Sequence, residues 1–102
     1  MITELNEQNF NEYIQKGIKF IAFLADWCSF CQQQKPVLKE LSDNDIFVGI
    51  IDSDCNPNLV QQWNIKAFPS FILFKNGEPI TTFSGLHTKY DLLNKLLNSL
   101  NK

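Results

Sequence analysis

Two cysteines three positions apart, Cys28 and Cys31, are the residues of this sequence best suited to chemistry. An apolar run over residues 20–25 precedes them, and a polar stretch compatible with a helix, residues 32–35, follows almost at once. A strand that ends at Cys-x-x-Cys and turns into a helix is typical of a redox-active dithiol. The pattern therefore predicts that the pair cycles between two thiols and one disulfide.

The place of each cysteine on the predicted helix indicates a different role for it. Cys28 lies where the helix begins, and the free amide hydrogens and the positive end of the helix dipole there stabilise a negative charge. Because only the thiolate attacks a disulfide, we expect Cys28 to be the nucleophile. Cys31 lies one turn further on the same side of the helix and is more shielded, so we expect it to resolve the mixed disulfide.

A zinc site is the structural alternative for such a pair of cysteines. Zinc needs four ligands, and Cys55 and His87 are the only other Cys or His residues in the sequence. Neither falls at a recognisable zinc-binding spacing, so we expect no metal and no other cofactor. Three cysteines cannot all pair within one chain, which argues against a secreted disulfide scaffold. We expect Cys55 to be a spectator thiol and His87 to be a surface loop residue.

Length and composition place the chain among ordinary globular domains. We expect residues 1–102 to form a single domain, since a chain of 102 residues can bury a hydrophobic core large enough for stability without disulfides or metal ions. The net charge is −2 and the nine lysines form no cluster, so we expect neither nucleic acid nor a membrane as a partner. The first twenty residues contain three glutamates and no continuous apolar core. We therefore expect no signal peptide and a cytoplasmic location.

Hydrophobic periodicity predicts strands and helices in alternation. Nearly continuous apolar runs predict two strands that are buried on both faces, and Asn76-Gly77 predicts a hairpin turn before the edge strand. The expected strands cover residues 1–5, 19–25, 46–51, 70–75 and 79–84, and the expected helices begin at Asn6, Ser29, Asn56 and Thr88. This order predicts an α/β fold with a central mixed sheet and helices on both faces.

Capping residues and helix breakers predict where the helices begin and end. Asn6 and Gly17 bound the first helix, which we expect to run to about residue 16. Asn56, immediately before Pro57, is the expected N-cap of the third helix. Pro36 lies inside the second helix and predicts a bend, because proline has no amide hydrogen and its ring crowds the preceding turn.

These motifs together make the whole chain resemble the thioredoxin family. Residues 27–31, Trp-Cys-Ser-Phe-Cys, match the family's Trp-Cys-x-x-Cys, and Pro36 falls five positions after the second cysteine, as the family's helix kink does. Residues 68–70, Phe-Pro-Ser, match the loop that carries a cis-proline opposite the cysteines. Residues 74–77 match the family's hairpin, and Gly85 matches the glycine after the last strand.

The resemblance implies a fold, a reaction and partners. The fold would be the thioredoxin fold, in which a mixed five-stranded sheet of order 1-3-2-4-5 is flanked by four helices. The reaction would be thiol–disulfide exchange that reduces the disulfides of other proteins. The electrons would come from a flavin-containing thioredoxin reductase that uses NADPH. We expect the protein to act as a monomer.

The resemblance also implies a substrate groove beside the cysteines. Its expected residues are Trp27, Ser29, Phe30, Phe68, cis Pro69, Gly85 and Leu86. Phe30 fits two interpretations, and the sequence does not decide between them: an exposed residue at a helix start, or an apolar contact for the substrate. Backbone groups at Phe68 are expected to pair with an extended segment of the substrate.

The sequence departs from the family at positions that tune its chemistry. Ser29-Phe30 replaces the usual Gly-Pro between the cysteines, and this dipeptide is the main tuner of reduction potential in thioredoxin-like proteins. The buried aspartate that assists proton transfer at the second cysteine is Ala22 here, and its lysine partner falls at about Ile50. We therefore expect slower resolution of the mixed disulfide than in typical thioredoxins.

Two other functions fit the same motifs. An oxidant or isomerase of the same fold is left open by the missing Gly-Pro dipeptide. A thioredoxin-like binding module with little turnover is favoured by the loss of the aspartate and lysine, whereas the intact Cys28 and Cys31 count against it. A cytoplasmic reductant of protein disulfides is the principal hypothesis.

Overall fold

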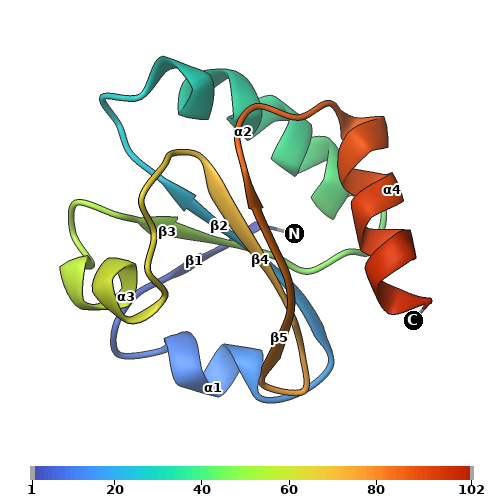
Figure 1. The fold of residues 1–102 in the computed structure, drawn as a ribbon, viewed down its shortest axis with the longest axis horizontal. Coiled ribbons are helices and arrows are strands. Elements are labelled where there is room, and N and C mark those ends of the chain that lie inside the picture. Colours follow the sequence, from blue (N-terminus) through green and yellow to red (C-terminus); the bar gives the residue numbers. More distant parts are fainter. Residues whose placement is uncertain (1, 102) are drawn as a thin grey trace.

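Residues 2–101, the part of the chain that the computed structural model describes, form five strands and four helices (Figure 1). In chain order these elements are β1 (Ile2–Leu5), α1 (Phe10–Ile14), β2 (Ile18–Leu24), α2 (Ser29–Ser42), β3 (Val48–Asp52), α3 (Pro57–Gln62), β4 (Ser70–Lys75), β5 (Glu78–Ser84) and α4 (Lys89–Leu100). The predicted alternation of strands and helices, closed by a hairpin and a last helix, is confirmed.

The five strands form one mixed sheet in the order β1-β3-β2-β4-β5. The strands β1, β3 and β2 are parallel, whereas β4 pairs antiparallel with β2, and β5 pairs antiparallel with β4. The β4–β5 hairpin turns at Asn76 and Gly77, whose φ angles of 51° and 87° suit the right-handed twist of the strands. Both the predicted fold class and the implied strand order are confirmed.

The sheet separates two hydrophobic cores, one on each face, and alternate side chains of its central strands enter one or the other. In β2, Phe20, Ala22 and Leu24 belong to the core under α2 and α4. Ile21 and Phe23 of the same strand belong to the core under α1 and α3. Figure 1 shows these two pairs of helices on opposite sides of the sheet. The period of two along β2 therefore fixes which face α2 covers.

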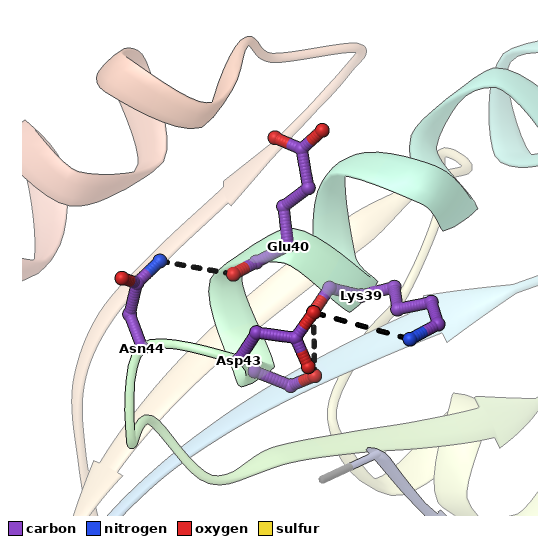
Figure 2. Close-up of polar contacts among 5 residues, drawn as sticks. Lys39, Glu40, Asp43 and Asn44 are labelled. Atoms are coloured by element: carbon purple, nitrogen blue, oxygen red, sulfur yellow. Dashed lines mark hydrogen bonds and ion pairs between the residues drawn. The ribbon is translucent and has the colours of Figure 1, made fainter.

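The helix α2 covers the predicted residues and includes Pro36. Its inward stripe consists of four buried residues, Cys31, Gln34, Leu38 and Leu41. At its C-terminal end, the ammonium of Lys39 lies 3.9 Å from the carboxylate of Asp43, and the side-chain amide of Asn44 donates to the carbonyl of Glu40 at 2.9 Å (Figure 2). Burial of the inward stripe against the sheet holds the start of α2, where the cysteines lie, in a fixed position.

The first helix is shorter than predicted. It begins at Phe10 and ends at Ile14, whereas the sequence predicted a helix from Asn6 to about residue 16. The side chain of Asn6 accepts the amide hydrogens of Gln8 and Asn9, at 2.9 and 3.0 Å. Asn6 thus stabilises a turn ahead of the helix, because its short polar side chain competes for the amides that a helix start leaves free.

Asn56 occupies the predicted N-cap position of α3, with Pro57 as the first helical residue. Its side chain makes no capping hydrogen bond to α3. The oxygen Oδ1 accepts the amide hydrogen of Glu7 at 3.0 Å, and the nitrogen Nδ2 donates to the carbonyl of Asp52 at 2.9 Å. Asn56 is buried, and its side chain joins the start of α3 to the segment before α1, a long-range contact that local sequence cannot show.

Other element boundaries differ little from expectation. Met1, the first residue of the first predicted strand, lies outside the described residues. The strand β3 covers Val48–Asp52 rather than residues 46–51, and β5 begins at Glu78 rather than at residue 79. Thr88 is confirmed as the N-cap of α4, since its hydroxyl accepts the amide hydrogen of Asp91 at 3.1 Å.

Candidate active site

The two cysteines lie at the first turn of α2, just after the carboxyl end of β2. Cys28 is the N-cap residue, with an extended backbone (φ −93°, ψ 116°), and its sulfur accepts the amide hydrogen of Cys31 at 3.3 Å. Both cysteines are free thiols, and Ser29 follows as the first residue of the helix, exposed to solvent. The amide and the positive end of the helix dipole therefore both favour a negative charge on the Cys28 sulfur.

Cys31 has a different environment from Cys28. Its exposed fraction is 0%, compared with 8% for Cys28. Burial, followed by a hydrogen bond to the Cys28 side chain, raises the pKa of Cys31 to about 11. The Cys31 thiol is therefore protonated at neutral pH and must lose its proton before it can attack.

The loop at Phe68 and Pro69 faces Cys28 across the site. The peptide bond between these two residues is cis, as the resemblance implied. The Cys28 thiol donates to the Phe68 carbonyl at 3.5 Å, and the Pro69 carbonyl accepts the amide hydrogen of Gly85 at 2.9 Å. Hydrogen bonds thus connect the start of α2 to the loop before β4, and that loop to the turn after β5.

The side chain of Gln34 joins α2 to the segment after β5 through hydrogen bonds to the His87 backbone. Its side-chain nitrogen donates to the His87 carbonyl at 3.0 Å, and its side-chain oxygen accepts the His87 amide hydrogen at 2.9 Å. Gln34 is fully buried, so both ends of its amide group are satisfied inside the protein. The inner side of α2 is thereby joined to the segment that carries Gly85 and Leu86.

His87 lies in the loop between β5 and α4, as the sequence predicted, but it is only partly exposed there. Its ring is half-buried and lies edge-on to Phe71 and Phe83, with ring centroids 6.0 and 5.1 Å apart. Its Nδ1 lies 2.7 Å from the Gly85 carbonyl oxygen. His87 therefore anchors the segment after β5 through both its backbone and its ring.

The sequence pattern contains a signal for Gln34 that motif reasoning missed. Gln34 lies between Cys31 and Leu38 at spacings of three and four, on the inward stripe of α2. A polar residue on such a stripe must find a partner inside the protein. That requirement identifies Gln34 as a residue with a specific contact, although not which contact it makes.

Three large apolar side chains are exposed around the cysteines. Their exposed fractions are 69% for Trp27, 53% for Phe30 and 42% for Leu86. The Trp27 ring lies edge-on to Phe68 at a centroid distance of 5.6 Å, and its indole nitrogen donates to the Asp54 carboxylate at 3.3 Å. Contacts thus join Trp27 to Phe68 and Pro69 to Gly85, with apolar surface on Trp27, Phe30 and Leu86 exposed to solvent.

The two positions at which the chain lacks the family's charged residues are neighbours. Ala22 of β2 lies opposite Ile50 of β3 in the parallel register. Ala22 is fully buried, and Ile50 packs against the same core as Cys31. Neither side chain can accept or donate a proton, so deprotonation of Cys31 must depend on other groups.

Cys55 lies outside this arrangement. It is exposed, and its thiol donates to the Asp52 carboxylate at 3.5 Å, a contact that raises the pKa of Cys55 because the carboxylate opposes the thiolate. Within residues 2–101, no group of three or more His, Cys, Asp or Glu side chains is placed to hold a metal ion.

The fold and the cysteine site define the class of protein. A mixed sheet of order 1-3-2-4-5, a Cys-x-x-Cys pair at the start of α2 and a cis-proline opposite it are the features of a thiol–disulfide oxidoreductase with the thioredoxin fold.

Comparison with known proteins gives the same result. The family model described as thioredoxin matches residues 1–98. Thioredoxin of Staphylococcus haemolyticus is 35% identical over 89% of this chain and 90% of the relative. Thioredoxins of Chlamydia caviae and Buchnera aphidicola are each 33% identical, over 96% and 98% of this chain and 97% of either relative. The chain belongs to the thioredoxin family.

Family membership identifies the reaction. The protein is a thiol–disulfide oxidoreductase that reduces protein disulfides, which confirms the function expected from the sequence. Disulfide-containing proteins are its substrates, and a thioredoxin reductase is its partner, as for the family.

The buried Gln34 contact predicts a loss of stability on truncation. Gln34→Ala removes both hydrogen bonds to the His87 backbone and leaves those two groups without partners, so the free energy of unfolding should fall by about 2–3 kcal/mol. Gln33, the exposed neighbour on the same helix, provides the matched control, and Gln33→Ala should change stability by less than about 0.5 kcal/mol. Urea unfolding measures both, and equal stability of the two variants would contradict the structural role of Gln34.

Proposed function

We propose that the protein acts as a reductant of protein disulfides, with Cys28 as the nucleophile and Cys31 as the resolving cysteine. One observation carries this assignment. The Cys31 amide donates to the Cys28 sulfur at the N-cap of α2, while the Cys31 sulfur is fully buried. The first sulfur thus accepts an amide hydrogen bond at the helix start, close to the surface, and the second is kept protonated until it is needed.

The exchange takes place in two steps. The Cys28 thiolate attacks one sulfur of the substrate disulfide and forms a mixed disulfide, and the other substrate sulfur leaves as a thiolate and takes up a proton. Cys31 then loses its proton and attacks the Cys28 sulfur, forming the Cys28–Cys31 disulfide and releasing the second substrate thiol. The substrate gains two electrons, and the cysteine pair loses two.

The residues around the cysteines are proposed to form the groove that holds the substrate. The exposed faces of Trp27, Phe30 and Leu86 support this role, since aromatic and apolar surface of this kind is typical of protein-binding sites. The other proposed groove residues are Ser29, Phe68, Pro69 and Gly85. Phe30 is thereby interpreted as an apolar contact for the substrate.

The oxidised pair must be reduced again after each cycle. We propose that a flavin-containing thioredoxin reductase supplies the two electrons from NADPH. Membership of the thioredoxin family supports this partner.

A reducing compartment suits the thiols of this chain. Three cysteines cannot all pair within one chain, and Cys55 is an exposed thiol outside the active-site pair, as expected where glutathione keeps thiols reduced. We therefore propose a cytoplasmic location and a single-domain monomer. Residues 2–101 contain no helix that is both long enough and apolar enough to cross a membrane.

Reduction of insulin tests the enzyme against a binding module without turnover. With dithiothreitol as the electron donor, the wild type should accelerate insulin precipitation, and Cys28→Ser should fall to the rate of dithiothreitol alone because no nucleophile remains. Cys55→Ser, which removes a thiol outside the site, is the matched control and should keep the wild-type rate. A wild type no faster than dithiothreitol alone would show that the protein is a module.

A redox titration against glutathione tests the direction of exchange. The fraction of oxidised Cys28–Cys31 pair is measured by alkylation and mass spectrometry at a series of glutathione ratios. We expect a potential on the reducing side of about −230 mV, towards the about −270 mV already known for thioredoxins. A more oxidising potential would contradict the proposed reductant and favour an oxidant or isomerase.

A further inference from the structure

A pocket of about 250 Å³ lies beside the cysteine site, between α2 and the β1 side of the sheet. Its lining combines three apolar residues with four charged ones, namely Ile2, Leu24, Ile50, Glu4, Asp26, Asp52 and Lys35. The apolar members Leu24 and Ile50 belong to, or pack against, the core that contains Cys31. Two of the apolar lining residues thus pack in the same core as the resolving cysteine.

Strand register explains how the carboxylates reach this pocket. Glu4 of β1 lies opposite Ile50 of β3, and Asp52 of β3 lies opposite Leu24 of β2. Because side chains alternate along a strand, Ile50 and Asp52 face the same side of the sheet, the side covered by α2. Two neighbouring strands thus present carboxylates towards one helix.

Lys35 is the cation that α2 brings to this pocket. It follows Cys31 by four residues, so the two side chains lie on the same side of the helix, one turn apart. Lys35 is exposed, and its charge acts on the neighbouring thiol in the direction of a lower pKa of Cys31, against the larger effect of burial. Lys35 lines the pocket together with Glu4, Asp26 and Asp52.

The resolving step needs a positive charge near Cys31. The sulfur must exist as a thiolate while it is still buried, and a thiolate loses solvation there. Nearby, the titratable groups are Cys28 before α2, Glu4, Asp26 and Asp52 around the pocket, and His87 before α4. Negative charge on Cys28 or on the carboxylates opposes a second anion, whereas the charge of Lys35 favours it.

We propose that Lys35 is a positioning residue for the resolving step, in which its ammonium stabilises the Cys31 thiolate as that sulfur attacks Cys28. This role rests on the proposed function, because it concerns the second of its two steps. The proton leaves Cys31 for solvent, the new sulfur–sulfur bond joins Cys28 and Cys31, and the bond between Cys28 and the substrate breaks. The substrate sulfur departs with the electron pair and takes up a proton.

Dithiobis(nitrobenzoic acid) separates the two steps in one stopped-flow experiment. Attack by Cys28 releases one coloured thiol, and resolution by Cys31 releases a second, so each step has its own absorbance phase. All proteins carry Cys55→Ser, because the exposed Cys55 would also react. The rates are measured from pH 6 to pH 10 for the wild type and for Lys35→Gln, Lys35→Arg and Lys39→Gln.

Lys39→Gln is the matched control. Lys39 is an exposed lysine on the same helix, one turn further from Cys31, and pairs with Asp43 at 3.9 Å (Figure 2). Lys35→Gln and Lys39→Gln therefore remove the same net charge from the same helix. Only the first removes it from the pocket beside the resolving cysteine.

The expected result is a selective effect on the second phase. Lys35→Gln should slow that phase about 3- to 10-fold at pH 7 and move its pH–rate profile to higher pH, because a thiolate that loses a positive neighbour forms only at higher pH. The first phase should stay within about twofold of the wild type. Lys35→Arg should restore the second phase, and Lys39→Gln should match the wild type in both.

Three results would overturn the proposal. One is a second phase of Lys35→Gln that overlays the wild type at every pH. Another is an equal slowing by Lys39→Gln, which would show a general effect of net charge. The third is a failure of Lys35→Arg to restore the rate. Failure of the proposed function has a different signature, since the wild type itself would then lack the Cys28-dependent first phase.

Discussion

The hydrogen bond from the Cys31 amide to the Cys28 sulfur exists because Cys28 is the N-cap of α2, and the chemistry of the site depends on that position. One turn of helix separates an N-cap sulfur, which accepts an amide hydrogen bond, from a buried sulfur that holds its proton. A helix that began elsewhere would offer its free amides to another side chain, and the two thiols would lose the difference between their roles.

The rest of the fold holds this helix start in place from three directions. The inward stripe of α2 is buried against the sheet, in the core that also contains Ala22 and Phe71. The loop before β4 is bonded to Cys28 through the Phe68 carbonyl. The segment after β5 is bonded to α2 through Gln34. These three sets of contacts join α2, the loop before β4 and the segment after β5 to one another. The same contacts therefore position the cysteines and the segments that carry the exposed apolar side chains.

The sequence predicted the features that depend on residues close together in the chain. It did not predict the side-chain contacts that depend on a partner far away in the chain. Thr88 caps its helix because hydroxyl and amide lie within four residues, and the hairpin forms because Asn-Gly accepts positive φ angles. Asn56 occupies the N-cap position of α3, but its side-chain oxygen accepts the amide hydrogen of Glu7, 49 residues away, instead of capping the helix. The contact of Gln34 and the pocket around Lys35 depend likewise on strand register and helix packing, which no single stretch of sequence encodes.

Trapping of the mixed disulfide tests most directly whether Cys28 attacks and Cys31 resolves. In Cys31→Ser the resolving sulfur is absent, so incubation with insulin should leave a covalent adduct that peptide mass spectrometry locates on Cys28. We predict that this adduct accumulates on Cys28 of Cys31→Ser and that Cys28→Ser, whose remaining site thiol is buried and protonated, forms none on Cys31. An adduct on Cys31 of Cys28→Ser in equal yield would contradict the assignment of the two roles.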